Sequence, residues 1–211
     1  MRQASEDKVA ADIPERLADQ VERVSAVVRK MHVATSGALG RDCFDHTLLG
    51  RALLIDAGVH SRLVLGYAAW RVGAGDGDVL SHAPGATSYG PGHAVYHSWL
   101  ETATWLIDLT TYQFRCKARQ LDQADGHVTS VKWSPDFLLI RRDQVKTLWH
   151  VRQAPQSGVV YYEERPELWD VLKPSTELDR GLLAAARIVM KNPQMNVVGP
   201  NNFERVLHRA L

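Results

Sequence analysis

The stretch HSWLETATWLID, residues 97–108, decides the fold because it places two short apolar segments on either side of a polar turn. A two-residue or four-residue turn centred on Thr102 and Ala103 makes it a β-hairpin. In either case His97 is predicted to lie directly opposite Asp108 on the same face, with Cβ atoms about 4.5–5.5 Å apart. A histidine held by a carboxylate is half of a nucleophilic site, so we expect a nucleophile elsewhere in the chain.

Cys43 is the candidate nucleophile, in the segment GRDCFDHTLLGRALL. It stands at the predicted start of a helix, with Asp42 as the expected cap. Unpaired backbone N–H groups and the positive end of the helix dipole lower the pKa of a thiol at this position. The alternative is a buried structural cysteine, because free cysteine is among the most buried residue types. Cys116, in FRCKAR, has no accompanying histidine or helix start, and we expect it to be structural.

Periodicity and turn residues predict an α+β domain with an antiparallel sheet. Two helices precede the sheet, the hairpin lies within it, and further helices follow. The expected elements are helices over about 14–32, 42–58 and 175–192, strands over 59–72 and within 157–165, and a short helix from about 202.

Residues 73–92 connect the strand at 59–72 to the hairpin and are rich in glycine, proline and serine. This composition predicts an irregular segment, and a long irregular connection is often functional. We expect it to border the space between Cys43 and His97 and to help select substrate. The alternative is a surface excursion on another side of the domain.

The chain has 211 residues, of which 45% are hydrophobic, and a formal net charge of +1. These values predict a single domain over residues 1–211 and give no overall field that favours nucleic acid or an acidic membrane surface. The first residues are polar, unlike a signal peptide, and no segment approaches the roughly 18 apolar residues of a membrane span. We expect a cytoplasmic protein with no cofactor and no nucleic-acid or membrane partner. The oligomeric state stays open.

Three motifs in order resemble the transglutaminase-like branch of the papain-like cysteine superfamily. They are the cysteine opening a helix followed by LLIDAGVHSRLVLGYA, the strand HSWLE, and WLIDLTTYQF. The similarity spans about residues 41–114, and GYAAWRVG and IDLTTYQF also resemble a bacterial family of uncharacterised members in this superfamily. The resemblance implies a papain-like fold, with the nucleophile helix packed on the antiparallel sheet and residues 115–211 completing the sheet and adding helices.

By the same resemblance, Cys43 is the nucleophile, His97 the general base and acid, and Asp108 the residue that orients the imidazole. The implied activity is hydrolysis of an amide or peptide bond through an acyl-enzyme, on a peptide, a protein or a small amide. Acyl transfer to an amine is the alternative. Papain-type proteases use a glutamine before the cysteine in the oxyanion hole, and this sequence has none there. The second oxyanion donor therefore has no assignment.

Four further residues are candidate substrate contacts: Trp99, His93, His82 and Gln113. Trp99 and His93 share the face of His97 because strand side chains repeat every second residue, although Trp99 also fits a core position. His82 lies in the expected irregular segment. Gln113 is expected to finish the second hairpin strand together with Phe114.

Two other classes of function remain open at this stage. Cys43 and His46 stand on one helical face and, with His97 or His93, make a possible zinc site. We nevertheless expect no bound metal, with His46 a solvated or capping residue. The other class is a binding module that keeps the fold without turnover.

Overall fold

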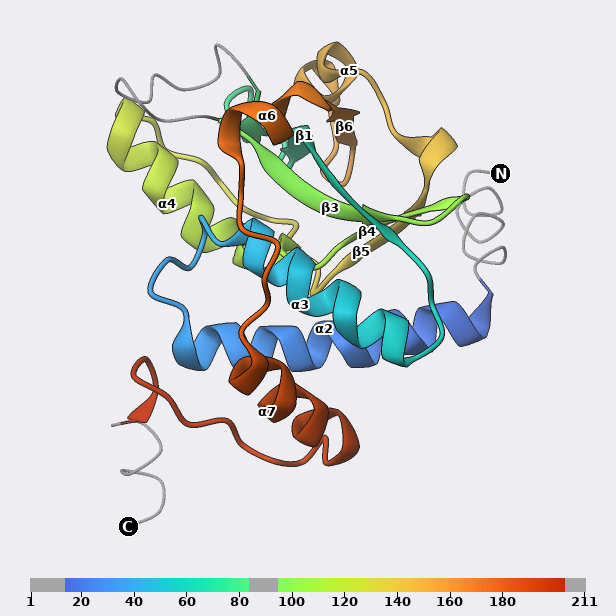
Figure 1. The fold of residues 1–211 in the computed structure, drawn as a ribbon. Coiled ribbons are helices and arrows are strands. Elements are labelled where there is room, and N and C mark those ends of the chain that lie inside the picture. Colours follow the sequence, from blue (N-terminus) through green and yellow to red (C-terminus); the bar gives the residue numbers. More distant parts are fainter. Residues whose placement is uncertain (1–13, 84–94, 204–211) are drawn as a thin grey trace.

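The structure is a computed structural model that describes residues 14–83 and 95–203, and it has an α+β architecture (Figure 1). The helices are α2 (Glu15–Thr35), α3 (Cys43–Asp56), α4 (Phe114–Asp125), α5 (Leu148–Gln153), α6 (Glu167–Leu172) and α7 (Arg180–Lys191), with short 3-10 turns at Thr111–Gln113 and Arg142–Gln144. The strands are β1 (Arg62–Arg71), β2 (Val79–His82), β3 (His97–Glu101), β4 (Trp105–Asp108), β5 (Leu138–Arg141) and β6 (Val160–Glu164).

The six strands form one antiparallel sheet around the long strand β1. Gly66 pairs with His97 of β3, Ala68 pairs with His82 of β2, and both also pair with residues of β6. Because a strand residue has one neighbour on each side, β2 and β3 follow one another along the same edge of β1, and β6 occupies the other edge. The end of β2 and the start of β3 therefore meet.

The hairpin forms as predicted, but its register differs by two residues. Glu101 pairs with Leu106, and the N–H of Thr102 donates to the carbonyl of Trp105 at 2.9 Å. The Thr102 hydroxyl also accepts from the N–H of Trp105 at 2.9 Å, which places the turn one residue later than expected. His97 is therefore diagonal to Asp108 rather than directly opposite. A shift of two residues keeps both side chains on the same face.

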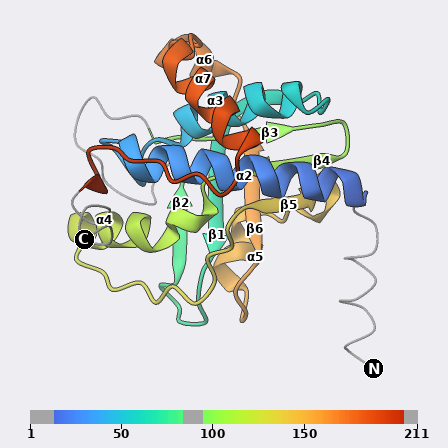
Figure 2. The same ribbon diagram turned by 90° about the horizontal axis from the view of Figure 1, so that it is seen from below.

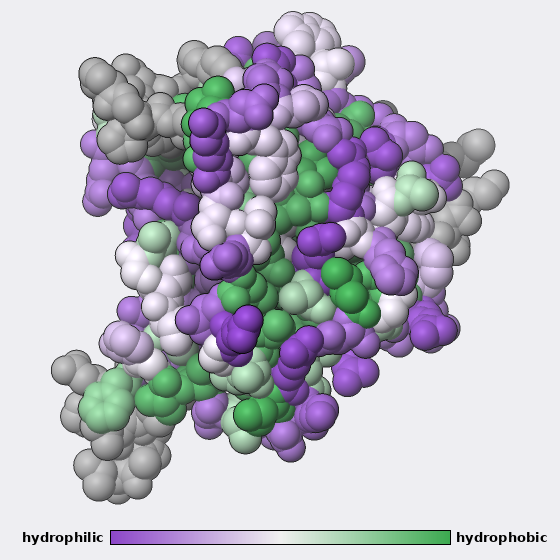
Figure 3. All heavy atoms as spheres, viewed as in Figure 1, coloured by the Kyte–Doolittle hydropathy of each residue, from purple (hydrophilic) through white to green (hydrophobic). Residues whose placement is uncertain are grey.

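Helices α2, α3 and α7 pack against one another on one face of the sheet (Figures 1 and 2). The predicted apolar stripe of α2 is confirmed, since Val21, Val24, Val28 and Met31 are all buried there. The opposite face of β1 and β3 packs against α4 and carries most of the buried aromatic side chains. In Figure 3, hydrophobic residues form a band over the middle of the visible face, bordered by hydrophilic ones.

Three element predictions need correction. The segment 73–92 was expected to be irregular, yet it contains β2. Gln113 and Phe114 do not finish a strand, because the chain turns at Thr111–Gln113 directly into α4. The helix expected from residue 175 begins at Arg180, where the Asp179 carboxylate accepts from the N–H of Leu182 at 2.7 Å and caps it.

Most of the helix expected from residue 202 lies outside the described residues. Within residues 14–83 and 95–203, none of the helices combines the length and apolar character that crossing a bilayer requires.

Candidate functional site

Cys43 is the first residue of α3, and its side chain is buried, with 7% exposure. Asp42 occupies the N-cap position, but its side chain makes no capping hydrogen bond, contrary to the expectation. Its carboxylate instead accepts from the hydroxyl of Ser36 at 2.5 Å. The N–H groups in the first turn of a helix lack intrahelical partners, so the Cys43 thiol lies at the positive end of the helix dipole.

His97 and Asp108 form a buried pair in which both side chains have 0% exposure. The Nε2 of His97 donates to Oδ2 of Asp108 at 2.8 Å. Oδ1 of Asp108 accepts from the N–H and the hydroxyl of Thr110, both at 2.8 Å, and Oδ2 also accepts from the Tyr162 hydroxyl at 2.7 Å. With both oxygens engaged, the carboxylate is held in one orientation.

The second ring nitrogen of His97 completes this arrangement. Nε2 keeps its proton and uses it for the hydrogen bond to Asp108. In the neutral ring Nδ1 therefore carries no proton and can act as a base. Among the described residues, Nδ1 has no aligned hydrogen-bond partner, so it is the nitrogen available to Cys43. Each of the two side chains shifts the pKa of the other toward the charged form.

The pKa values of these three groups shift in the directions that a thiolate–imidazolium pair requires. Burial raises the pKa of Cys43, but His97, with smaller contributions from Lys117 and Ser98, lowers it below the ordinary thiol value. Burial lowers the pKa of His97, and the charge and hydrogen bond of Asp108 outweigh this and raise it. Burial also opposes ionisation of Asp108, yet its hydrogen bonds and the charge of His97 hold its pKa below the usual range.

Aromatic rings enclose the imidazole of His97. Trp70 meets it edge-on with ring centroids 4.8 Å apart, and Trp99 lies nearly parallel to it at 6.2 Å. Trp70 also donates from Nε1 to the hydroxyl of Tyr162 at 2.7 Å, so the same network orients the hydroxyl that binds Asp108. The predicted placement of Trp99 beside His97 is confirmed.

His82 also lies beside His97, although it belongs to a strand and not to an irregular segment. As the last residue of β2 it stacks on His97 with ring centroids 5.9 Å apart. Burial, followed by the charges of Lys117 and His97, lowers the pKa of His82 well below its usual value, so its ring is neutral near pH 7. The candidate contact His93 and residues 84–92 of the expected substrate segment lie outside the described residues.

Gln113 does not face His97 but braces the chain just before Cys43. Its Oε1 accepts from the N–H of Gly40 at 2.6 Å, which turns its amide nitrogen toward Nε2 of His46 at 2.9 Å. His46 Nε2 is therefore an acceptor, and Nδ1 carries the proton that it donates to the carbonyl of Asp42 at 2.9 Å.

His46 is thus a buried structural residue rather than a solvated or capping one. Burial, followed by the charge of His32, lowers its pKa to about 4, which agrees with a neutral ring. The Cys43–His46 zinc site finds no support, because both nitrogens of His46 already have partners.

A second metal candidate consists of His32, Asp42 and His46, whose donor atoms lie within 4.8 Å of one another. The imidazole rings of His32 and His46 are stacked with centroids 3.7 Å apart. Two imidazoles bound to one ion at about 2.0–2.1 Å, with a ligand angle of 90° or more, have ring centroids at least about 4.5 Å apart. The stacked pair therefore does not fit a shared ion without rearrangement, and the cluster is better described as a brace for Asp42.

Tyr162 and Lys117 are two site residues that were not predicted from the sequence. Alternation in the strand VVYYEER could have placed Tyr162 in the core, because Val160 and Tyr162 point to the same buried face. Lys117 stands at i+3 from Phe114, on the apolar face that Ala118 and Leu121 continue. A lysine on the buried stripe of a helix is a signal, but it was hidden because Phe114 was placed in a strand.

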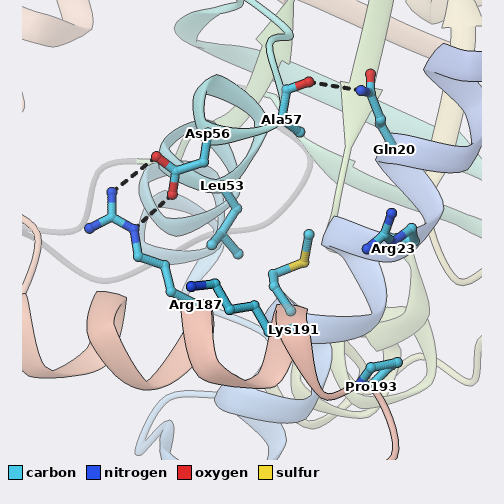
Figure 4. Close-up of a pocket in the computed structure, with 9 residues that line it drawn as sticks. Gln20, Arg23, Leu53, Asp56, Ala57, Arg187, Lys191 and Pro193 are labelled. Carbon is cyan, nitrogen blue, oxygen red and sulfur yellow. Dashed lines mark hydrogen bonds and ion pairs between the residues drawn. The ribbon is translucent and has the colours of Figure 1, made fainter.

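A separate hollow of about 590 Å³ lies between α2, α3 and α7 (Figure 4). Leu53, Asp56 and Ala57 line it, at the end of α3 opposite to Cys43, which is roughly 20 Å away along the helix. Arg187 of α7 binds Asp56 with two hydrogen bonds, of 2.7 and 3.0 Å, beside it. The hollow contains none of the candidate site residues.

The sequence matches no protein-family model and no curated protein sequence. Among solved structures, the chain is similar to the crystal structure of a structural-genomics target, "genomics APC5867". The TM-score is 0.51 at 17% sequence identity, over 82% of this chain and 78% of that chain. At this identity the likeness concerns the fold alone, and it supports an α+β architecture shared by the two proteins.

Proposed function

We propose that the protein is a cysteine acyl-transfer enzyme with a papain-like, transglutaminase-like fold, and that it hydrolyses an amide or peptide bond. The observation that carries the proposal is the buried His97–Asp108 pair, which leaves Nδ1 of His97 available to Cys43 at a helix start. Histidine–carboxylate pairs also occur as structural elements. An interacting cysteine with a lowered pKa favours catalysis over that reading.

In the proposed reaction, the Cys43 thiolate attacks the carbonyl carbon of the substrate and a carbon–sulfur bond forms. The carbonyl electron pair moves to oxygen and then returns as the carbon–nitrogen bond breaks. The departing amine takes the proton from Nδ1 of His97, and an acyl-enzyme remains. Water activated by His97 then hydrolyses the thioester, while an amine in place of water gives acyl transfer.

The test uses p-nitrophenyl acetate, which needs no knowledge of the natural substrate, in a Cys116→Ser background that leaves Cys43 as the single thiol. We expect a burst of about one p-nitrophenolate per chain, and acetylation of Cys43 visible by mass spectrometry. Cys43→Ala should abolish the burst, and His97→Ala should slow it by several orders of magnitude. A thiol that reacts at the same rate with and without His97 would contradict the proposal and favour a binding module.

A further inference from the structure

Lys117 is a buried lysine on α4 whose ammonium group has no hydrogen-bond or ion-pair partner in the part of the chain that the structure describes. The residue is 2% exposed, and Nζ lies over the Trp70 ring, 4.9 Å from its centroid. A cation–π contact offsets part of the cost of burying a charge, but an ammonium group on a side chain that is this little exposed ordinarily has an anionic partner as well. The missing partner points to a ligand.

The neighbours of Lys117 on α4 hold the residues that lead into Cys43. Cys116 donates its thiol to the carbonyl of Leu39 at 3.6 Å, and Nε2 of Gln120 donates to the same carbonyl at 2.8 Å. The contacts of these two residues show that this part of α4 packs directly against the segment before α3.

Lys117 also contacts Trp70, one of the aromatic residues that enclose His97. The Trp70 ring beneath its ammonium group contacts His97 edge-on. Burial lowers the pKa of Lys117, and the largest opposing effect is the charge of Cys43, followed by that of Asp108. Because Nζ lies over Trp70 and Trp70 contacts His97, the ammonium group is one aromatic ring away from the imidazole that serves Cys43.

We propose that Lys117 forms an anion-binding position beside Cys43, where it stabilises the negatively charged oxygen that develops on the substrate carbonyl. This rests on the proposed function and supplies the oxyanion donor for which the sequence before Cys43 has no glutamine. As the thiolate forms the carbon–sulfur bond, the carbonyl electron pair moves to the oxygen facing Nζ. The pair returns when the carbon–nitrogen bond breaks. Lys117 keeps its proton throughout, while His97 supplies the proton to the amine.

The ratio of two alkylation rates measures this charge without a natural substrate. Iodoacetate and iodoacetamide attack the same thiolate, but only iodoacetate carries an anion into the site. In the Cys116→Ser background, we expect the iodoacetate-to-iodoacetamide ratio at Cys43 to exceed that of glutathione. Lys117→Met keeps the aliphatic chain over Trp70 and should lower the ratio by about tenfold. Lys132→Met, at an exposed lysine, is the matched control and should leave the ratio unchanged.

The second measurement is the p-nitrophenyl acetate burst. Lys117→Met should slow the burst by at least about tenfold, more than it slows alkylation by iodoacetamide, because only the ester develops an oxyanion. Lys117→Gln replaces Lys117→Met if the apolar variant does not fold, as judged by its thermal melt.

The outcomes separate this inference from the proposed function. A wild-type ratio no higher than that of glutathione, or a ratio unchanged in the Lys117 variant, overturns the role of Lys117 while leaving Cys43 a competent nucleophile. A Cys43 that reacts with neither reagent faster than a free thiol overturns the proposed function itself.

Discussion

Tyr162 and His97 donate to the same oxygen of Asp108, from opposite sides of the sheet's central strand. The Tyr162 hydroxyl is 2.7 Å and Nε2 of His97 is 2.8 Å from Oδ2. Tyr162 belongs to β6 and His97 to β3, which flank β1 on its two edges. The carboxylate is thus fastened to a strand that lies outside the hairpin, so its position does not depend on the hairpin alone.

Replacing Tyr162 by phenylalanine should weaken the hold on Asp108 without removing the ring from the core. The acetylation rate of Cys43 should fall by roughly tenfold, the effect of one hydrogen bond to a charged group. Tyr161→Phe, on the neighbouring residue that points the other way and bonds to Glu163, is the matched control. Equal burst rates in the two variants would show that the Tyr162 hydroxyl does not matter for the site.

Asp108→Asn should move the pH profile of Cys43 alkylation toward that of a free thiol. In the wild-type protein the thiol pKa is lowered and the imidazole pKa is raised, so alkylation by iodoacetamide should already be fast below pH about 8.5. Removing the carboxylate charge lowers the pKa of His97, and the less available imidazolium then lets the pKa of Cys43 rise.

The measurement is the alkylation rate from pH 5 to pH 10 in the Cys116→Ser background. The midpoint should rise in Asp108→Asn, and residual ester turnover should remain because the nucleophile is still present. Asp143→Asn, at an exposed carboxylate paired with Arg141, is the control. A midpoint that stays at the wild-type value would mean that Asp108 does not act on His97.

Gln113→Ala should destabilise the protein by about 1–3 kcal/mol, because it leaves the buried N–H of Gly40 without its partner and removes one of the hydrogen bonds of the His46 ring. Gln120→Ala, which removes a hydrogen bond to the neighbouring Leu39 from a more exposed residue, should cost less. Chemical denaturation gives both free energies of unfolding. A Gln113 variant as stable as the wild type would show that the brace before Cys43 is dispensable.

Sequence periodicity was enough to place α2, α3, β1 and the shared face of His97 and Asp108, but it did not find β2, α4 or β5. It missed the register because the Thr102 side chain bonds to the N–H of Trp105, a local competition that alternation of apolar residues does not reveal. Lys117 and Tyr162 escaped for different reasons. Lys117 was hidden because residues 113 and 114 were expected to continue the strand, whereas Tyr162 reaches Asp108 from β6, which is distant in sequence and lies beside the site only once it pairs with β1.

Gly66→Ala tests whether the site depends on the close packing of β1 between β3 and β6. A Cβ built on Gly66 lies 2.0 Å from the carbonyl oxygen of Glu163 and 2.6 Å from Cη2 of Trp99, so the neighbouring strand and the tryptophan both have to move. Because Gly66 also pairs with His97, this movement should disturb the imidazole. We expect the free energy of unfolding to fall by about 1–3 kcal/mol and the melting temperature to fall by several degrees. Alkylation of Cys43 should slow in the same variant.

Gly37→Ala is the matched control, because a Cβ at this position meets no atom within 4 Å. This variant should leave both measurements unchanged. A Gly66 variant that melts within a degree of the wild type and alkylates at the same rate would show that the strand spacing tolerates the methyl group and that His97 does not depend on it.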